Sequence, residues 1–481
     1  MPLDAVSTTT LEEMNAILAR QKAAHVRDGQ PSAARRKEWL DRCIGLMVDH
    51  QNDIVEAIAS DFGWRSKDAS AFTDVMGSIS SLKFAKARVE KWMRTQRRNT
   101  EFPLGLFGAK TEVRMQPKGV VGLVSPWNFP VTLTFGPMAG IFAAGNRVMI
   151  KPSEFTPATS ELMKRMVESA FSEEEAAVLV GGPDIGSAFT SLPFDHLIFT
   201  GATSIGKLVM RAASENLTPV TLELGGKSPV VIGRSADMQK VANRVMAGKT
   251  LNAGQICLAP DYVMTPKELR GEFVDAAQEA VRTLYPTLKD NDDYTSIVSQ
   301  RHYDRLNGYL EEARDKGAET IEINPAGEDF SQQPHYKIPP TLILDPTDDM
   351  AVMQDEIFGP ILPVKTYSDV RETVDYVNAN PRPLGLYYFG EDAAEREDVV
   401  NNTTSGGVTV NDVIMHVGAE DAPFGGVGPS GMGAYHGYDG FLEFTHKKTV
   451  YTQMPGEKVA SMLRPPYDEK FRKMVAGRIK R

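Results

Sequence analysis

The first hundred residues carry the spacing of hydrophobic side chains that is typical of helices buried along one face. One stripe repeats every three or four positions and contains Leu40, Cys43, Ile44 and Met47. Ser32 is a suitable N-cap for this helix, which we expect to run toward Ser60. A second helical region is predicted over about 69–93. Because Cys43 lies inside the stripe, we interpret it as a core thiol.

From Gly119 onward, short β-branched runs alternate with segments of helical spacing. The predicted strands are Val120–Val124, Arg147–Ile150, His196–Thr200, Val220–Leu224 and Pro229–Ile232. The predicted helices are Pro157–Ser169, Ser204–Ala213, Met238–Leu251, Arg270–Tyr285, Arg301–Lys316 and Val370–Asn378. This alternation predicts an α/β fold in which helices cover both faces of parallel sheet.

Three segments stand outside the alternation. Gly105–Pro117 and Gly433–Thr452 have the character of extended arm strands. The end of the chain, 464–481, carries seven Lys and Arg residues against Asp468 and Glu469. A basic tail of this kind is either a solvated terminal helix or a contact for acidic lipid or RNA.

Composition narrows the class of protein. A chain of 481 residues predicts about two to four domains. The net charge of −10 argues against a nucleic-acid partner. Two cysteines make no disulfide framework, so a reducing, cytoplasmic location is expected. We expect neither a secretory signal nor an integral membrane segment, since prolines and asparagines interrupt the most apolar stretch, Gly119–Ile150.

Cys257 is the first candidate for chemistry. It follows Asn252-Ala-Gly-Gln-Ile, where small residues allow close backbone approach and no amphipathic stripe explains a buried thiol. An ordinary thiol has a pKa of about 8.5 and needs positive surroundings to react as thiolate. The residues alone leave two interpretations open, a nucleophile and a buried structural cysteine.

Two polar side chains follow predicted strands, where open α/β sheets place their sites. Glu223 precedes the pair Gly225-Gly226 and is either a general base or an exposed carboxylate at a strand end. Asn128 lies in the rigid turn Pro126-Trp-Asn-Phe-Pro130. It either donates a hydrogen bond to a developing oxyanion or satisfies its own turn.

Other strand ends suit a nucleotide. Lys151 and Glu154 follow one strand and are placed to reach a ribose or a phosphate. The turn Gly201–Gly206 opens a helix whose free N–H groups suit a pyrophosphate. It is neither the G-x-G-x-x-G fingerprint nor a complete Walker loop, because Leu208 follows Lys207. The eight His residues show no metal-binding spacing, so no metal is expected.

The order of these motifs resembles the NAD(P)-dependent aldehyde dehydrogenase superfamily over roughly 32–451. The resemblance is carried by the motifs at 126–130, 151–154, 199–206, 223–229, 254–257, 356–360 and 423–428. It implies that Cys257 is the nucleophile and Glu223 the general base for deacylation. It also implies an oxyanion hole made by Asn128 and the backbone N–H of Cys257.

The resemblance further implies an NAD(P) site and its residues. The side chains and glycines expected beside the cofactor are Trp127, Lys151, Glu154, Gly186, Gly201, Ala202, Gly206, Glu356 and Phe358. Ala202 and Ser204 stand where the family often has Ser and Glu. Glu154 favours NAD because it repels a 2′-phosphate, and the nearby Lys151 softens that repulsion, so NADP is expected to be usable.

The implied fold has a Rossmann-type cofactor domain, an α/β catalytic domain and a bridging oligomerisation arm. We expect the cofactor domain over 1–104 and 118–222 and the catalytic domain over 223–425. The arm is expected over 105–117 and 433–452, and it implies a homodimer. The chain then ends in the basic tail, 464–481.

Within the superfamily, the chain is most similar to the coniferyl aldehyde dehydrogenase and class 3 branch. This similarity lies in Ser125–Pro130, Asn411–Val417, Ala422–Gly433 and Phe444–His446. It implies oxidation of an aromatic or otherwise large hydrophobic aldehyde to the acid. Three alternatives remain: a CoA-acylating relative, a non-catalytic structural protein on the same scaffold, and a cysteine hydrolase without nucleotide.

Overall fold

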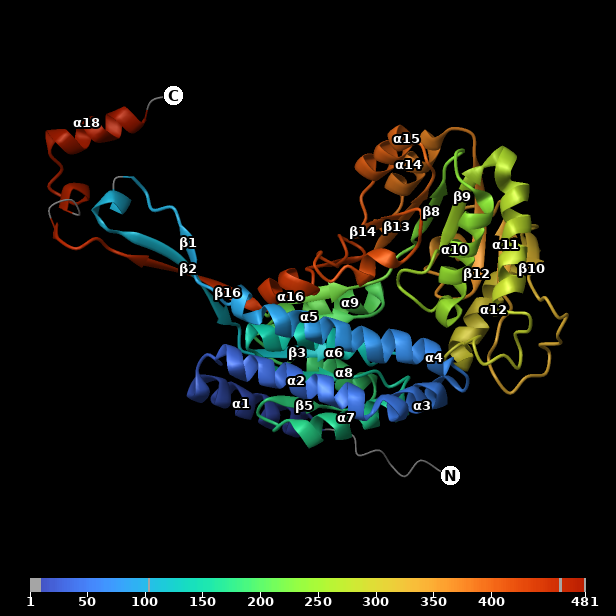
Figure 1. The fold of residues 1–481 in the computed structure, drawn as a ribbon, viewed down its shortest axis with the longest axis horizontal. Helices are drawn as coiled ribbons and strands as arrows, with labels where there is room; N and C mark the ends of the chain where they lie inside the picture. The colour runs from blue at the N-terminus through green and yellow to red at the C-terminus, as the bar shows by residue number, and fades with distance from the viewer. Residues whose placement is uncertain (1–9, 103, 458–460, 480–481) are drawn as a thin grey trace.

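The structure, a computed structural model, describes residues 10–102, 104–457 and 461–479. Within these residues the strands form three sheets, and helices cover the two larger ones. Figure 1 shows two lobes, each built on one large sheet, and a narrow arm that projects away from them. The predicted α/β fold class is confirmed.

The first lobe is built on a sheet with the strand order β15-β7-β6-β3-β4-β5. Its strands are β3 (Val120–Val124), β4 (Arg147–Lys151), β5 (Ala176–Val178), β6 (His196–Thr200), β7 (Val220–Glu223) and β15 (Gly431–Met432). All neighbours are parallel except β15, which pairs antiparallel with β7 and places Gly431 opposite Glu223. The segment that forms β15 therefore returns from the far end of the chain to the edge of this sheet.

Helices surround this sheet and bury its hydrophobic strands. They are α1 (Leu11–Asp28), α2 (Ala33–Asp49), α3 (Gln51–Phe62), α4 (Lys67–Ser70), α5 (Gly77–Trp92), α6 (Thr132–Ala144), α7 (Pro157–Ala170), α8 (Pro183–Thr190), α9 (Thr203–Ser214) and α16 (Gly437–Glu443). A π-helix, η1 (Ala71–Met76), joins α4 to α5. Side chains on both faces of β3 and β4 are buried, as expected for parallel strands covered on both sides.

The second lobe is built on a sheet with the strand order β10-β11-β12-β9-β8-β13-β14. Its strands are β8 (Pro229–Ile232), β9 (Tyr262–Pro266), β10 (Glu319–Glu322), β11 (Thr341–Leu344), β12 (Ile361–Tyr367), β13 (Gly385–Phe389) and β14 (Gly407–Val410). Its helices are α10 (Met238–Thr250), α11 (Arg270–Leu284), α12 (Gln300–Asp315), α13 (Ala351–Gln354), α14 (Val370–Ala379) and α15 (Ala393–Asn402). Only the edge strand β10 runs antiparallel to its neighbour in this sheet.

The arm is the third sheet, with the strand order β1-β2-β16. Its strands are β1 (Gln96–Arg98), β2 (Lys110–Pro117) and β16 (Thr445–Thr452). The arm also carries the short helices η2 (Leu104–Phe107) and η6 (Ser461–Leu463), and the terminal helix α18 (Glu469–Arg478). Among the described residues, no helix has both the length and the hydrophobicity to span a bilayer.

The five predicted strands and six predicted helices of the α/β region are present, with ends shifted by one residue at most. The arm differs in detail from the expected segments. It gains β1, which we expected in the cofactor domain, and 437–443 forms α16 instead of a strand. This helix contacts α6, where a Cβ on Gly140 would lie 3.2 Å from the backbone of Gly440.

The N-terminal helices differ from the prediction at one point. Ser32 caps α2 as expected, since its hydroxyl accepts the N–H of Arg35 at 3.2 Å. The helix does not continue to Ser60, because His50 has φ −107° and ψ 16° and α3 begins after it. Hydrophobic spacing continues across this break, so the pattern alone does not reveal it. Cys43 is fully buried in the core, as predicted.

The terminal helix α18 lies on the surface. In the basic tail, α18 has no buried residue, and Arg478 donates to the Glu101 carboxylate of the arm at 2.6 Å. Residues 480–481 of the predicted tail lie outside the described residues. Whether the tail is a solvated terminal helix or a contact for acidic lipid or RNA stays a prediction.

We predict that Gly431→Ala lowers the free energy of unfolding by about 3 kcal/mol, because the added Cβ collides with backbone in addition to straining φ. Gly431 has φ +143°, and an added Cβ would lie 2.1 Å from the carbonyl oxygen of Leu222. Thermal and urea unfolding measure the effect. The control is Gly428→Ala, where φ is +62° and no atom lies within 4 Å. Equal losses in the two variants would contradict the prediction.

Candidate active site

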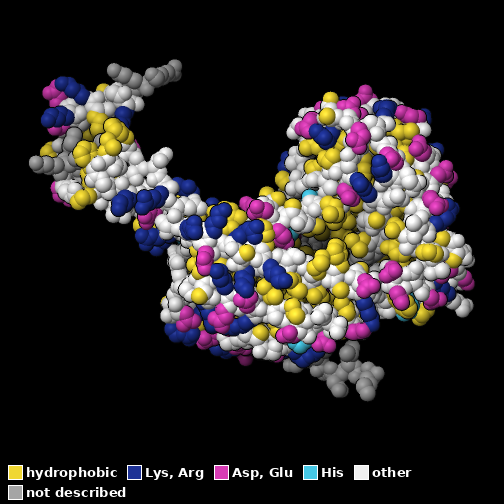
Figure 2. Space-filling view, in the orientation of Figure 1, with side chains coloured by type: hydrophobic (Ala, Val, Ile, Leu, Met, Phe, Trp, Pro, Cys, Tyr) yellow, Lys and Arg dark blue, Asp and Glu magenta, His cyan; other side chains and the backbone are white. Residues whose placement is uncertain are grey.

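A cavity of about 770 Å³ lies between the two lobes. Figure 2 shows this hollow on the face of the molecule, with apolar side chains around it. Eight of the residues singled out from the sequence line it, namely Trp127, Asn128, Gly201, Ala202, Glu223, Cys257, Glu356 and Phe358. One cavity therefore brings together the carboxyl ends of strands in the first lobe and two loops of the second lobe.

The loop before Cys257 has an unusual backbone. Asn252, Ala253 and Gly254 have φ of 50°, 51° and 73°, in the left-handed region. A Cβ on Gly254 would lie 2.3 Å from the carbonyl oxygen of Gly359, so only glycine permits this approach. The loop therefore lies directly against the segment that carries Glu356.

Gln255 holds the same loop from inside the protein. Its Nε2 donates to the carbonyl oxygens of Asn252 and Ser296, both at 3.0 Å, and its Oε1 accepts the N–H of Val298 at 3.0 Å. The neighbouring side chains Ile256 and Leu258 are buried in the core of the first lobe. The thiol is thus fixed relative to both lobes.

Cys257 is half-buried and faces carboxylates. Burial raises the pKa of its thiol to about 12, and the carboxylates of Glu356 and Glu223 act in the same direction. The backbone N–H groups of Cys257 and Leu258 lower the pKa and so favour the thiolate. Burial and the two acids prevail, so the thiol is neutral at pH 7 in this state of the protein.

Asn128 joins the first lobe to the cysteine loop. Its Nδ2 donates to the carbonyl oxygen of Gln255 at 3.1 Å. The backbone carbonyl oxygen of Asn128 accepts hydrogen bonds from Arg65 Nη1 at 2.5 Å and from Asn252 Nδ2 at 3.2 Å. The side chain does not merely satisfy its own turn. It reaches across to the cysteine loop and lines the cavity, and its NH₂ group has a second hydrogen to donate.

Glu223 ends β7 with its side chain buried, so it is not the exposed strand-end carboxylate that we considered. Both carboxylate oxygens lack a hydrogen-bond partner among the described residues. Burial raises the pKa of Glu223 well above its ordinary value, and the negative charge of Glu443 raises it further. A carboxyl group in this environment has the proton affinity that a general base needs near neutral pH.

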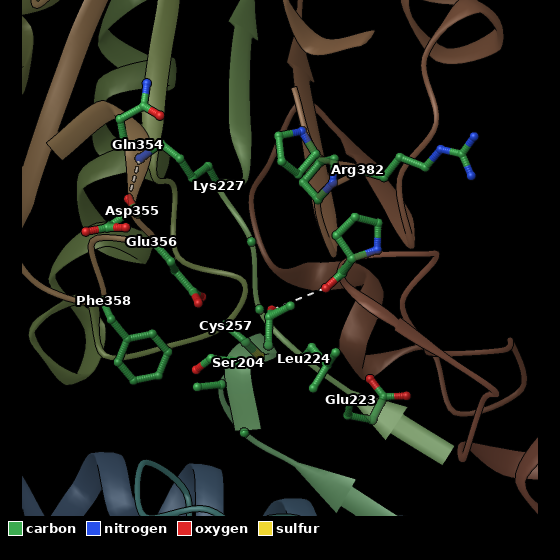
Figure 3. A pocket seen from close by; sticks show the side chains of 18 of the residues that line it. Ser204, Glu223, Leu224, Lys227, Cys257, Gln354, Asp355, Glu356, Phe358 and Arg382 are labelled. Carbon is green, nitrogen blue, oxygen red and sulfur yellow. Dashed lines mark hydrogen bonds between the residues drawn. The ribbon is translucent and has the colours of Figure 1, made fainter. Parts of the chain in front are cut away.

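Glu356 approaches the other side of the thiol. A Cβ on Gly225 would lie 2.1 Å from its Oε2, so the glycine lets the carboxylate lie over the backbone. Burial raises the pKa of Glu356 to about 8, and the Asp261 carboxylate adds to this effect. Its Oε1 has no hydrogen-bond partner among the described residues. Figure 3 shows Cys257 between Glu356 and Glu223.

Four of the residues predicted to bind a cofactor do not line this cavity. Lys151 is buried, donates to the carbonyl oxygen of Pro152 at 2.7 Å and lies 3.8 Å from the carboxylate of Glu154. Glu154 lines a second cavity between α3 and α7. Gly186 lies in α8, and Gly206 lets α9 pack closely on Leu224. Their roles toward a cofactor stay predictions.

The structure adds cavity residues that no sequence motif indicated. Two come from α12: the ring of His302 lies 5.2 Å from that of Trp127, and Arg305 Nη1 donates to the carbonyl oxygen of Ile357 at 2.9 Å. Arg305 therefore supports the segment between Glu356 and Phe358. Among the described residues, no group of three or more His, Cys, Asp or Glu side chains is arranged to hold a metal ion.

The fold and the cavity define a two-lobed α/β protein with a cysteine and two glutamates in the cleft between its lobes. The chain belongs to the aldehyde dehydrogenase family, whose model matches residues 2–450. The family assignment made from the motifs is confirmed.

Two relatives support the expected branch. A probable coniferyl aldehyde dehydrogenase of Caulobacter vibrioides is 64% identical over 483 residues, with 100% of this chain and 99% of the relative covered. The coniferyl aldehyde dehydrogenase of a Pseudomonas species is 51% identical, with 95% of this chain and 94% of the relative covered. The resemblance to the coniferyl and class 3 branch is thus confirmed.

One solved structure matches nearly the whole chain. It is the substrate-bound state of AldH from Staphylococcus aureus, with a TM-score of 0.90 and 35% identity. The match covers 98% of this chain and 100% of that one. The arrangement of two lobes and an arm is therefore shared over the full length of that protein.

We predict that Glu356→Gln makes Cys257 react about three- to tenfold faster with iodoacetamide at pH 9. Above its pKa of about 8, Glu356 is negative and raises the pKa of the thiol. Removing that charge increases the thiolate fraction. At pH 6.5 Glu356 is already neutral, so the two proteins should react alike. Alkylation is followed by mass spectrometry of the Cys257 peptide.

The control is Asp355→Asn, because Asp355 also lines the cavity and does not act on the pKa of the thiol. Its alkylation rate should match that of the unmodified protein at both pH values. A Glu356→Gln protein that reacts no faster at pH 9 would show that the carboxylate does not control the thiol.

Proposed function

We propose that this protein oxidises an aldehyde to the carboxylic acid with NAD, through a covalent intermediate on Cys257. The observation that carries the proposal is the meeting of Cys257, Asn128, Glu223 and Glu356 at one cavity between the lobes. Family membership supports the same reaction class. Each of the four residues has a distinct part in the proposed chemistry.

In the first step, the Cys257 sulfur adds to the aldehyde carbon, and the π electrons of the carbonyl move to its oxygen. The free amide hydrogen of Asn128 and the backbone N–H of Cys257 stabilise that oxyanion. One preorganised donor of this kind is worth about 3 kcal/mol. Before this step the thiol of Cys257 loses its proton to solvent, and the N–H groups of Cys257 and Leu258 stabilise the thiolate that results.

The residues of the cavity fit a dinucleotide. The unpartnered Glu356 Oε1 suits the hydroxyls of a ribose. The N-terminus of α9 has no side-chain cap, so its first N–H groups are open to a pyrophosphate beside Gly201 and Ala202. When bound, NAD would supply the hydride acceptor for the carbon attached to sulfur. Phe358 and Trp127, with ring centroids 5.4 Å apart, would border that ring.

Glu223 completes the reaction by activating water. Loss of hydride leaves a thioester on Cys257. Glu223 takes a proton from water as the water oxygen bonds to the acyl carbon, the carbon–sulfur bond breaks, and the acid is released. Its buried, unpartnered carboxyl group is suited to hold that proton.

We propose an aromatic, coniferyl-type aldehyde as substrate, supported by the names of the two relatives. We propose NAD as the preferred cofactor because Glu154 is an acid and Lys151 is only partly available to offset it, being bonded to the carbonyl of Pro152. The residues assigned here to catalysis and to cofactor binding remain part of this proposal.

We also propose a homodimer in a reducing, cytoplasmic compartment. The arm exposes large apolar side chains, among them Phe102, Leu106 and Phe107, which a second copy would cover. Both cysteines are free thiols. We also propose a boundary between the cofactor and catalytic domains near 222, supported by the end of β7 at Glu223 and the start of β8 at Pro229.

We predict NADH formation with coniferaldehyde and benzaldehyde at higher kcat/KM than with hexanal or acetaldehyde, and with NAD preferred over NADP. Cys257→Ala should lower the rate about a thousandfold or more. Absorbance of NADH and analysis of the acid measure both. Acid formed without CoA argues against a CoA-acylating relative, whereas an inactive native enzyme favours the structural-protein alternative.

We predict that Glu223→Gln lowers steady-state turnover about 10²- to 10⁴-fold and leaves a rapid burst of one NADH per active site. The thioester still forms in this variant, but water is no longer activated to cleave it. Stopped-flow absorbance measures the burst, and intact mass spectrometry measures the acyl adduct on Cys257. A variant without a burst would assign Glu223 to an earlier step.

A further inference from the structure

An ion pair lies fully inside the first lobe, next to the cavity. Arg65 follows α3, and Asp74 lies in the π-helix η1. Arg65 Nη2 is 2.9 Å from Asp74 Oδ2, and their side chains are 1% and 0% exposed. The mechanism above uses neither residue.

Both partners of the pair bind the segment that carries Asn128. Arg65 Nη1 donates to the carbonyl oxygen of Asn128 at 2.5 Å. Asp74 Oδ1 accepts the backbone N–H groups of Val131 and Thr132 at 3.1 and 3.3 Å. The pair therefore holds 128–132 at both ends, from an element that precedes it by more than fifty residues.

Aromatic rings fix the guanidinium in place. Its central carbon lies 4.8 Å from the ring centroid of Phe62 and 5.0 Å from that of Phe129. Phe129 directly follows Asn128, so ring stacking and the hydrogen bond act on adjacent residues. The planar guanidinium of Arg65 donates to a carboxylate and to a carbonyl at the same time. The ammonium group of a lysine lacks this fixed arrangement of donors.

Stability alone does not explain this arrangement. Burial opposes the charge on both groups, and it lowers the pKa of Arg65 and raises that of Asp74. Buried ion pairs can often be replaced by apolar side chains at no cost in stability. The π-helix is a second unusual feature, since such turns are rare and frequent at functional sites. Both features converge on the position of Asn128.

We propose that Arg65 and Asp74 are positioning residues that hold Asn128 for the substrate oxygen. Arg65 fixes the carbonyl of Asn128 while Asp74 fixes the turn that follows. The side-chain amide then keeps one hydrogen on Gln255 and the other toward the cavity. This inference rests on the proposed function, in which Asn128 stabilises the oxyanion.

The test is a double-mutant cycle between Asp74→Asn and Asn128→Ala. Asp74→Asn keeps the shape of the side chain and removes the charge that orients Arg65. We expect it to lower kcat/KM for the aldehyde about 10- to 100-fold. In the Asn128→Ala background the same change should cost less than about twofold, because the group that it positions is already gone.

A second variant and a control keep the test independent of folding. Arg65→Lys retains the positive charge but loses the paired N–H donors of the guanidinium. It should therefore lower kcat/KM severalfold and show the same coupling to Asn128→Ala. Glu56→Gln breaks an exposed ion pair with Lys67 near the same helices and should leave kcat/KM unchanged. Thermal unfolding and NAD binding are measured for every variant, and NAD affinity should stay within about twofold.

The possible failures are distinguishable. If the loss caused by Asp74→Asn or Arg65→Lys is the same in both backgrounds, the pair does not act through Asn128 and the inference is overturned. If Asn128→Ala itself leaves kcat/KM unchanged, the oxyanion role fails, and the inference fails with it. If Cys257→Ala keeps activity, the proposed function fails as a whole.

Discussion

The burial of unpaired carboxyl groups around one thiol is the constraint on which the rest of this structure depends. Beside Cys257, Glu223 is buried and Glu356 is half-buried, and three of their four carboxylate oxygens have no hydrogen-bond partner among the described residues. Leaving such groups desolvated costs free energy that a stable scaffold must supply. The hydrophobic cores of the two lobes, each with its own sheet, supply this free energy and leave the acids in the cleft between the lobes. The unpartnered oxygens are therefore best understood as places for ligand atoms.

The cleft is held together by backbone approach more than by side-chain contacts. Gly225 admits the Glu356 carboxylate, and Gly254 admits the carbonyl of Gly359. A methyl group at either position would separate the acid or the thiol loop from its neighbour. Asn128 adds a hydrogen bond from the first lobe to the carbonyl of Gln255, so both lobes fix the geometry around the sulfur. The glycines and the amide together make the position of Cys257 a property of the whole fold.

Local pattern was enough to predict most of the fold and the centre of the site. Strands such as His196–Thr200 are short, β-branched and bounded by turns, so their ends follow from neighbouring residues. Cys257, Glu223 and Asn128 stand in motifs, and the structure places all three at one cavity. The break at His50 was missed because hydrophobic spacing continues through it. Arg65 and Asp74 were missed for a different reason, since their partners lie far along the chain and no local signal records such contacts.

The raised pKa of Glu356 connects ligand binding to the stability of the free protein. An unfolded Glu ionises near pH 4.3, whereas Glu356 in the folded protein ionises at about pH 8. Between these values the folded state keeps a proton that the unfolded state has lost, so this group makes stability fall as pH rises. Above pH 8 the carboxylate is charged and still buried. A ligand that donates hydrogen bonds to Glu356 stabilises the charged form and lowers its pKa. Binding of such a ligand therefore restores stability that the empty site loses as pH rises. Near neutral pH the same shift makes Glu356 negative in the cleft when the ligand is bound.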